Sequence, residues 1–155
     1  MQPGDTIPNL TLKTTDGKDL ATADLCRGKK IVLFAVPGAF TPTCSDHHLP
    51  GYVMRAEEIL AKGVDAIVCV AVNDHHVMRA WGNARGTGEQ ILLLADGNGD
   101  FARAMGLEVD LGAFGMGRRS RRYAAIVDDC VVKSLNIEQP GKLDVSTAEA
   151  VLAQL

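Results

Sequence analysis

Cys44 is the residue of this sequence best placed to act as a nucleophile. It follows an apolar run at residues 31–36 and a short segment that contains proline and glycine. Thr41 is a good N-cap residue and Pro42 suits the first position of a helix, so the pattern predicts a helix in which Cys44 is the third residue. Unpaired backbone N–H groups and the positive end of the helix dipole favour a thiolate there. We therefore expect a reactive sulfur that is open to solvent.

The segment around this cysteine resembles the active-site segment of the peroxiredoxins, in particular the peroxiredoxin-5 type. It reads Pro-Gly-Ala-Phe-Thr-Pro-Thr-Cys-Ser over residues 37–45, and His-Leu-Pro-Gly-Tyr follows over residues 48–52. Pro37, Thr41 and Cys44 match the family signature P-x-x-x-T-x-x-C. The resemblance extends over nearly the whole chain. It favours a reactive Cys44 over the alternative of a small buried apolar residue, which is common for free cysteines.

The resemblance implies a thiol-dependent peroxidase that reduces hydrogen peroxide and organic hydroperoxides. The Cys44 thiolate would attack a peroxide oxygen, release water or an alcohol, and become a sulfenic acid. Full ionisation speeds attack by an ordinary thiol roughly thirtyfold at most, so hydrogen-bond donors must also stabilise the breaking O–O bond. Thr41 would exchange hydrogen bonds with the peroxide, and Pro37 would shield the sulfur from water. The alternatives are that Thr41 only caps the helix and Pro37 only ends the strand.

A run of arginines late in the chain offers the remaining donor. In the peroxiredoxin-5 pattern the active-site arginine directly precedes the aromatic residue of a late strand, which selects Arg122. A guanidinium near the reactive sulfur would favour the thiolate and donate fixed hydrogen bonds to sulfur and peroxide. Arg119 is the reserve choice, while Arg118 and Arg121 are expected to be exposed. The alternative for the whole run is a solvated basic segment.

The other three cysteines bear on how the sulfenic acid is reduced. No C-x-x-C pair is present, so we expect free thiols in a reducing compartment. Cys69 lies within an apolar strand pattern and is expected in the core, Cys26 resembles a loop residue, and Cys130 lies in a predicted hairpin turn. Some peroxiredoxin-5 proteins carry a resolving cysteine near the carboxyl terminus, and this sequence has none. We expect a one-cysteine cycle completed by glutathione with glutaredoxin, or by thioredoxin, although resolution by one of these three cysteines stays open.

Two pairs of adjacent histidines raise the question of a metal. Cys44 and His47 could supply two ligands, but no second ligand pair with zinc-like spacing is evident. We therefore expect neither a metal nor a cofactor. His48 matches the family segment and is expected to form a hydrogen bond near the site.

The elements that must position these residues follow an α/β order. Apolar and alternating patterns predict strands at residues 10–15, 30–36, 65–72, 91–95, 123–127 and 131–137, and helices near 42–62, 73–85, 101–107 and 146–155. Residues 108–122 are expected to form a loop. Pro50 is expected to kink its helix, and Ser146 or Asp144 to cap the last one. One domain over residues 1–155 is predicted, with a mixed central sheet and helices on both faces. The resemblance implies a thioredoxin-like fold.

Composition and charge limit the partners. With 155 residues, 46% of them hydrophobic, and a formal net charge of −3, the chain is expected to be globular and to bind neither nucleic acid nor a membrane. It shows no signal-peptide pattern, so a cytoplasmic location is expected. The resemblance implies a homodimer. Two rival functions remain: a non-catalytic redox-sensing binding module with a thioredoxin fold, and a thiol–disulfide oxidoreductase, which the missing C-x-x-C pair disfavours.

Overall fold

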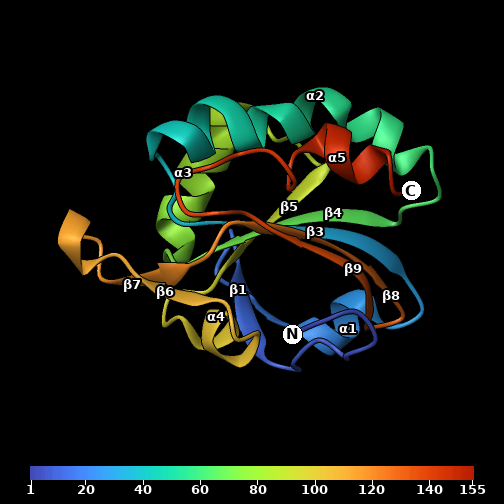
Figure 1. Cartoon of the computed structure of the whole chain (residues 1–155), viewed down its shortest axis with the longest axis horizontal. Helices are drawn as coiled ribbons and strands as arrows, with labels where there is room; N and C mark the ends of the chain where they lie inside the picture. The colour runs from blue at the N-terminus through green and yellow to red at the C-terminus, as the bar shows by residue number, and fades with distance from the viewer.

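A seven-stranded mixed sheet runs through the centre of the computed structural model, which describes all 155 residues (Figure 1). Its strands are β1 (Thr11–Thr14), β2 (Asp19–Ala21), β3 (Lys30–Val36), β4 (Ala66–Ala71), β5 (Ile91–Ala95), β8 (Tyr123–Asp128) and β9 (Val131–Ile137). The strand order is β2-β1-β5-β4-β3-β8-β9. β3, β4 and β5 are parallel, and the remaining pairs are antiparallel. The predicted α/β, thioredoxin-like architecture is confirmed.

Helices cover both faces of the sheet, as expected. They are α1 (Thr22–Cys26), α2 (Leu49–Leu60), α3 (His75–Arg85), α4 (Asp100–Ala104) and α5 (Ala148–Leu152). Figure 1 shows α2, α3 and α5 on one face and α1 with α4 on the other. Each face therefore has its own hydrophobic core. No helix has the length and apolar character required to cross a membrane.

β3 is the strand that supports the candidate site. It lies between β4 and β8, and its residues alternate between the two cores: Val32, Phe34 and Val36 face the first, and Ile31, Leu33 and Ala35 face the second. A strand covered on both faces needs apolar residues at every position, which explains its unbroken apolar run. Its carboxyl end is therefore a rigid support for the segment that carries Cys44.

The predicted loop at residues 108–122 is wrong. It forms a separate two-stranded ribbon of β6 (Glu108–Asp110) and β7 (Arg118–Ser120), joined through a short 3₁₀ turn at Gly112–Phe114. The ribbon projects from one end of the sheet (Figure 1). Its strands have three residues each, too few to show an apolar period, and an ion pair of 3.2 Å between Arg118 and Glu108 joins them.

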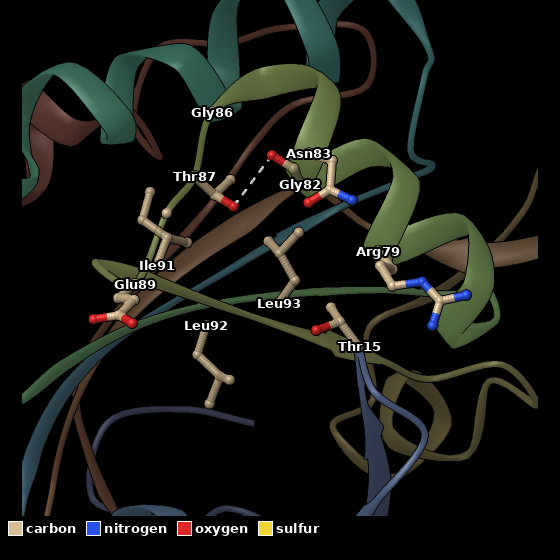
Figure 2. A pocket seen from close by; sticks show the side chains of 11 residues that line it. Thr15, Arg79, Gly82, Asn83, Gly86, Thr87, Glu89, Ile91, Leu92 and Leu93 are labelled. Carbon is tan, nitrogen blue, oxygen red and sulfur yellow. Dashed lines mark hydrogen bonds between the residues drawn. The ribbon is translucent and has the colours of Figure 1, made fainter.

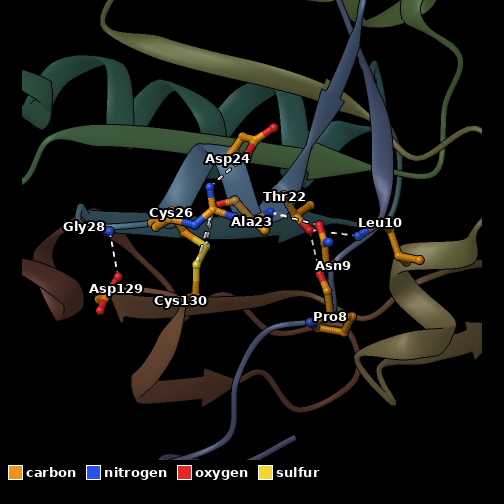
Figure 3. The surroundings of a disulfide bond; sticks show 11 residues. Pro8, Asn9, Leu10, Thr22, Ala23, Asp24, Cys26, Gly28, Asp129 and Cys130 are labelled. Atoms are coloured by element: carbon orange, nitrogen blue, oxygen red, sulfur yellow. Dashed lines mark hydrogen bonds and ion pairs between the residues drawn. A yellow bond between two sulfur atoms is a disulfide. The ribbon is translucent and has the colours of Figure 1, made fainter.

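The expectation of four free thiols is also wrong, because Cys26 and Cys130 form a disulfide (Figure 3). Cys26 is not a loop residue: it is the fully buried last residue of α1, a helix that was not predicted. Cys130 lies in the turn between β8 and β9. The pairing joins positions 104 residues apart, so local sequence patterns could not reveal it.

The last helix is shorter than predicted and has a different cap. The Thr147 hydroxyl, and neither Ser146 nor Asp144, accepts a hydrogen bond from the Ala150 backbone N–H at 3.1 Å. Ser146 is fully buried and bound to other partners. Ser146 therefore contributes to the hydrogen bonds around His48 rather than to the helix cap.

Candidate active site

The start of the helix that carries Cys44 agrees with the prediction. Helix begins at Pro42, and the Ser45 backbone N–H donates to the Thr41 carbonyl at 2.9 Å. Thr41 thus occupies the N-cap position and Cys44 the third helical position. The Thr41 hydroxyl does not cap the helix; it donates to the Gly38 carbonyl at 2.7 Å. The side chain therefore closes the preceding loop and stays within one helical turn of the cysteine.

A wide turn separates this start from the body of the helix. Residues Cys44–His48 form a π-helical turn, in which the Leu49 N–H donates to the Cys44 carbonyl. Pro50, in the first turn of α2, has no N–H for a helical bond, and the π turn accommodates this where we expected a simple kink. Both Cys44 and His48 are buried. The local widening thus places cysteine and histidine in one interior region.

Arg122 joins these two side chains. Its Nη2 donates to the Cys44 sulfur at 3.1 Å, and its Nη1 donates to His48 Nδ1 at 2.7 Å. Arg122 directly precedes β8, whose first residue, Tyr123, pairs with Ala35 near the carboxyl end of β3. The antiparallel register therefore brings together an arginine and a cysteine that lie 78 residues apart.

His48 is held as a neutral acceptor. Burial lowers its pKa to about 3, and the Arg122 charge acts in the same direction. Since Nδ1 accepts from Arg122, the proton belongs on Nε2, which donates to the Ser146 carbonyl at 3.0 Å. Tyr52 donates to the same carbonyl at 2.8 Å. The guanidinium therefore lies against a fixed, uncharged partner.

The hydrogen-bond network extends from His48 through Ser146 to Glu138. Its carboxylate accepts from the Ser146 hydroxyl at 2.7 Å, the Ser146 N–H at 2.8 Å and the Asp144 N–H at 2.7 Å. Although burial opposes ionisation, these donors keep the pKa of Glu138 below its usual value. Tyr52, Glu138 and Ser146 are not among the predicted site residues. No local pattern identifies Glu138 and Ser146, because contacts with the His48 region span up to 98 residues, whereas Tyr52 ends the segment at residues 48–52 that carries the resemblance.

The buried, neutral His48 predicts a pH-dependent stability. Unfolded His48 binds a proton near pH 6.5, whereas folded His48 does so only near pH 3. As the pH falls from about 6.5 towards 3, the unfolded state gains more protons. The free energy of unfolding should therefore fall by up to about 1.4 kcal/mol per pH unit from this group. Above pH 6.5 the contribution should be constant.

Urea unfolding of His48→Gln between pH 4 and 7 checks this. Glutamine can accept from Arg122 and donate to Ser146 but does not titrate, so its unfolding free energy should show a smaller slope with pH. His47→Gln is the matched control, because His47 is exposed. Parallel curves for the wild type and both variants would contradict the assignment.

The expectation of an open sulfur is not met in this structure. Cys44 is 0% exposed, and the Arg122 guanidinium lies against it. A pocket of about 610 Å³ nevertheless lies beside them, with Pro37, Thr43 and Arg122 among its lining residues. Arg122 both lines this pocket and donates to the Cys44 sulfur, so its side chain lies between the pocket and the cysteine. Thr41 and Pro37 are both partly buried at this end of β3.

The neighbouring arginines have other partners. Arg119, the reserve choice, donates to the carbonyls of Met116 at 2.9 Å and Val72 at 2.8 Å, and none of its hydrogen bonds goes to the cysteine. Arg118 is exposed, as expected. Arg121 is half-buried and lines the pocket, so its predicted exposure is wrong. Only Arg122 reaches the sulfur.

A second cavity, of about 510 Å³, lies between α3 and β5 (Figure 2). Arg79, Thr87 and Leu93 are among the residues that line it, and none of the predicted site residues does so. No group of three or more His, Cys, Asp or Glu side chains in the structure could hold a metal ion.

Comparisons with known proteins all point to one family. The family model described as Redoxin matches residues 2–152. Peroxiredoxin-2E-2 of the rice Oryza sativa subsp. japonica is 52% identical over 160 residues, which cover 98% of this chain and 71% of that protein. Peroxiredoxin-2C of the same plant is 47% identical over 156 residues, covering 98% and 96%.

Solved structures are also similar over the full chain. Reduced Prx3 of Vibrio vulnificus in complex with H₂O₂ has a TM-score of 0.95 and 52% identity, covering 100% of this chain and 99% of that one. Peroxiredoxin 5 of Alvinella pompejana has a TM-score of 0.87 and 35% identity, covering 99% and 96%. The similarity in sequence and in structure thus extends from end to end.

Proposed function

This chain belongs to the peroxiredoxins of the Redoxin family, thiol-dependent peroxidases, with Cys44 as its peroxidatic cysteine, and from this premise we propose a one-cysteine cycle completed by an external thiol. The reductant is glutathione with glutaredoxin, or thioredoxin. The observation that carries the peroxidase chemistry is the hydrogen bond from Arg122 to the Cys44 sulfur.

The environments of the other cysteines support the one-cysteine cycle. Cys69 is fully buried in the middle of β4, and burial raises the pKa of its thiol well above the usual value. Cys26 and Cys130 are bonded to each other and pack in the core on the other face of the sheet from Cys44. None of the three is a free, exposed thiol beside the sulfenic acid.

In the first step of the proposed cycle, the Cys44 thiolate attacks the nearer peroxide oxygen and the O–O bond breaks. The sulfur becomes a sulfenic acid, and the leaving oxygen takes up a proton as water or an alcohol. Arg122 donates hydrogen bonds to the sulfur and to the peroxide oxygen on which negative charge develops. Fixed donors stabilise such a charge most strongly. Thr41 supplies a hydroxyl to the peroxide, and Pro37 limits access of water. Two external thiols then reduce the sulfenic acid, with release of water and formation of their disulfide.

The role proposed for Thr41 predicts a loss on removal of its hydroxyl. Thr41→Val should lower kcat/KM for hydrogen peroxide about 10- to 100-fold, because the hydroxyl oxygen, whose proton goes to the Gly38 carbonyl, no longer accepts a hydrogen bond that positions the peroxide. Thr41→Ser, which keeps the hydroxyl, should stay within about threefold of the wild type. Stopped-flow oxidation of the reduced enzyme measures both. Equal losses for the two variants would mean that the methyl group and loop packing, rather than the hydroxyl, matter.

The reductant is tested by coupled assays run separately with glutathione plus glutaredoxin and with thioredoxin plus its reductase. Peroxide turnover with either system supports the proposal, and Cys69→Ala should retain it. Turnover lost in Cys69→Ala, together with a Cys44–Cys69 disulfide in the oxidised wild type, would overturn the one-cysteine cycle. A non-catalytic redox-sensing module would consume peroxide with neither system.

The homodimer implied by the family and the cytoplasmic location stay predictions. Light scattering after size-exclusion chromatography tests the first, and cell fractionation the second. Phe40 and Phe114 are large exposed apolar side chains available to an interface.

A further inference from the structure

Figure 3 shows the Cys26–Cys130 disulfide. Both of its residues pack with the second core, whereas Cys44 belongs to the first, so the central sheet separates the two sulfur sites. The Cα atoms of the pair are 5.0 Å apart, within the usual range for a disulfide. Cys26 is fully buried, while Cys130 is partly exposed in its turn.

The backbone at Cys130 is one that a cysteine seldom adopts. Asp129 and Cys130 have φ values of 48° and 66°, the left-handed region expected at both central positions of a tight hairpin turn. Glycine is the favoured residue at the second position because it has no Cβ. The turn geometry alone therefore does not account for a cysteine at position 130. The disulfide bond with Cys26 accounts for it.

The pair lies at one end of the strands that build the active site. Close to it, Asp129 accepts from the Gly28 N–H at 2.7 Å and donates its own N–H to the Lys29 carbonyl at 2.9 Å. β3 and β8 pair from this end, where Lys30 faces Asp128, to the other end, where Ala35 faces Tyr123. The disulfide thus holds the ends of β3 and β8 that lie far from Cys44 and Arg122.

We propose that Cys26 and Cys130 form a second thiol–disulfide exchange site, reduced by an external dithiol protein and re-formed by a small disulfide such as oxidised glutathione. Because Cys130 is partly exposed and Cys26 is fully buried, the reductant attacks Cys130 first. A thiolate of the dithiol attacks the Cys130 sulfur, the S–S bond breaks, and Cys26 leaves as a thiolate that takes up a proton. The second thiol of the reductant then displaces Cys130 and closes the reductant's own disulfide.

This exchange changes the stability of the fold and leaves the chemistry at Cys44 intact. The bond closes a loop that spans 104 residues, so its loss releases considerable entropy to the unfolded chain. Reduction should therefore lower Tm by about 5–10 °C. Peroxidase activity at 25 °C should change by less than about twofold, because no residue of the pair contacts the Cys44 site.

Cysteine mapping tests the site itself. In protein purified anaerobically without reductant, alkylation under denaturing conditions should label Cys44 and Cys69 alone, and a peptide linking residues 26 and 130 should be found. Treatment with thioredoxin and its reductase should expose all four thiols, and oxidised glutathione should restore the linked peptide. A thioredoxin variant with a single active-site cysteine should be trapped on Cys130.

The matched variant is Cys130→Gly, which removes the bond and suits the left-handed turn, so it should fold. Its Tm should not respond to reductant, unlike that of the wild type. The proposal is overturned if the four thiols stay free after oxidised glutathione, or if thioredoxin cannot reduce the pair. An equal response of Tm to reductant in Cys130→Gly would also exclude it. A failed peroxidase assay would instead concern the proposed function alone.

Discussion

Replacing Cys44 by serine is expected to lower kcat/KM for peroxide at least about 10⁴-fold, because a serine hydroxyl is not ionised at neutral pH and forms no sulfenic acid. The substitution should leave the fold in place. Serine is close to cysteine in size, and its oxygen can accept the hydrogen bond that Arg122 now donates to sulfur. Loss of a reacting atom, rather than loss of packing, should account for the effect.

Stopped-flow peroxide consumption by Cys44→Ser checks this result, together with circular dichroism to confirm folding. Cys69→Ala is the control. It also alters a fully buried cysteine of the same core, but it removes no group from the proposed peroxide-reduction step. Full activity in Cys44→Ser, or an equal loss in Cys69→Ala, would refute the assignment of Cys44 as the only reacting sulfur.

Replacing Arg122 by lysine is expected to lower kcat/KM about 100-fold, although the positive charge is kept. The guanidinium contacts Cys44 and His48 through two different nitrogens in one plane, a geometry that a single ammonium group does not reproduce. Losing one fixed donor to a transition state typically costs 10²- to 10³-fold in rate. Arg122→Met, which also removes the charge, should lose about 10³-fold.

Two neighbouring substitutions separate this effect from a general need for basic residues. Arg118→Lys should retain activity within about twofold, because Arg118 is exposed and paired with Glu108. Arg119→Lys should chiefly lower stability, since Arg119 binds only the Met116 and Val72 carbonyls. If Arg119→Lys lost activity in the assay and Arg122→Lys kept it, the reserve choice would be the correct arginine.

Because the Cys44 sulfur is buried under Arg122, the peroxide-reduction rates of Arg122 variants combine two effects. Cys44 has no exposed surface, and Arg122 both covers it and donates to it. A substitution at Arg122 can therefore open access while it removes transition-state stabilisation. The initial rate of alkylation by iodoacetamide reports access and thiolate character without an O–O bond to break. Comparing alkylation with peroxide reduction separates the two effects.

The local features of the site were predictable from the sequence. A helix N-cap, a proline at the first helical position and the place of Cys44 depend on residues within one or two turns, so Thr41, Pro42 and Cys44 lie where the pattern predicts. The buried strand β3 was equally evident from its unbroken apolar run. Arg122 followed from the family resemblance, because four nearby arginines look alike to any local rule.

The tertiary structure alone decided which distant side chains meet. Three long-range contacts join residues 74 to 104 positions apart: Arg122 with the neutral His48, His48 with Ser146, and Cys26 with Cys130. The Ser146–Glu138 contact, which extends this network, is local. Sheet order and register create these contacts, and no spacing along the chain encodes them. The burial of Cys44 has the same origin. Local hydrogen bonding and apolar periodicity thus placed the nucleophile, whereas the packing of distant strands supplied its partners and its cover.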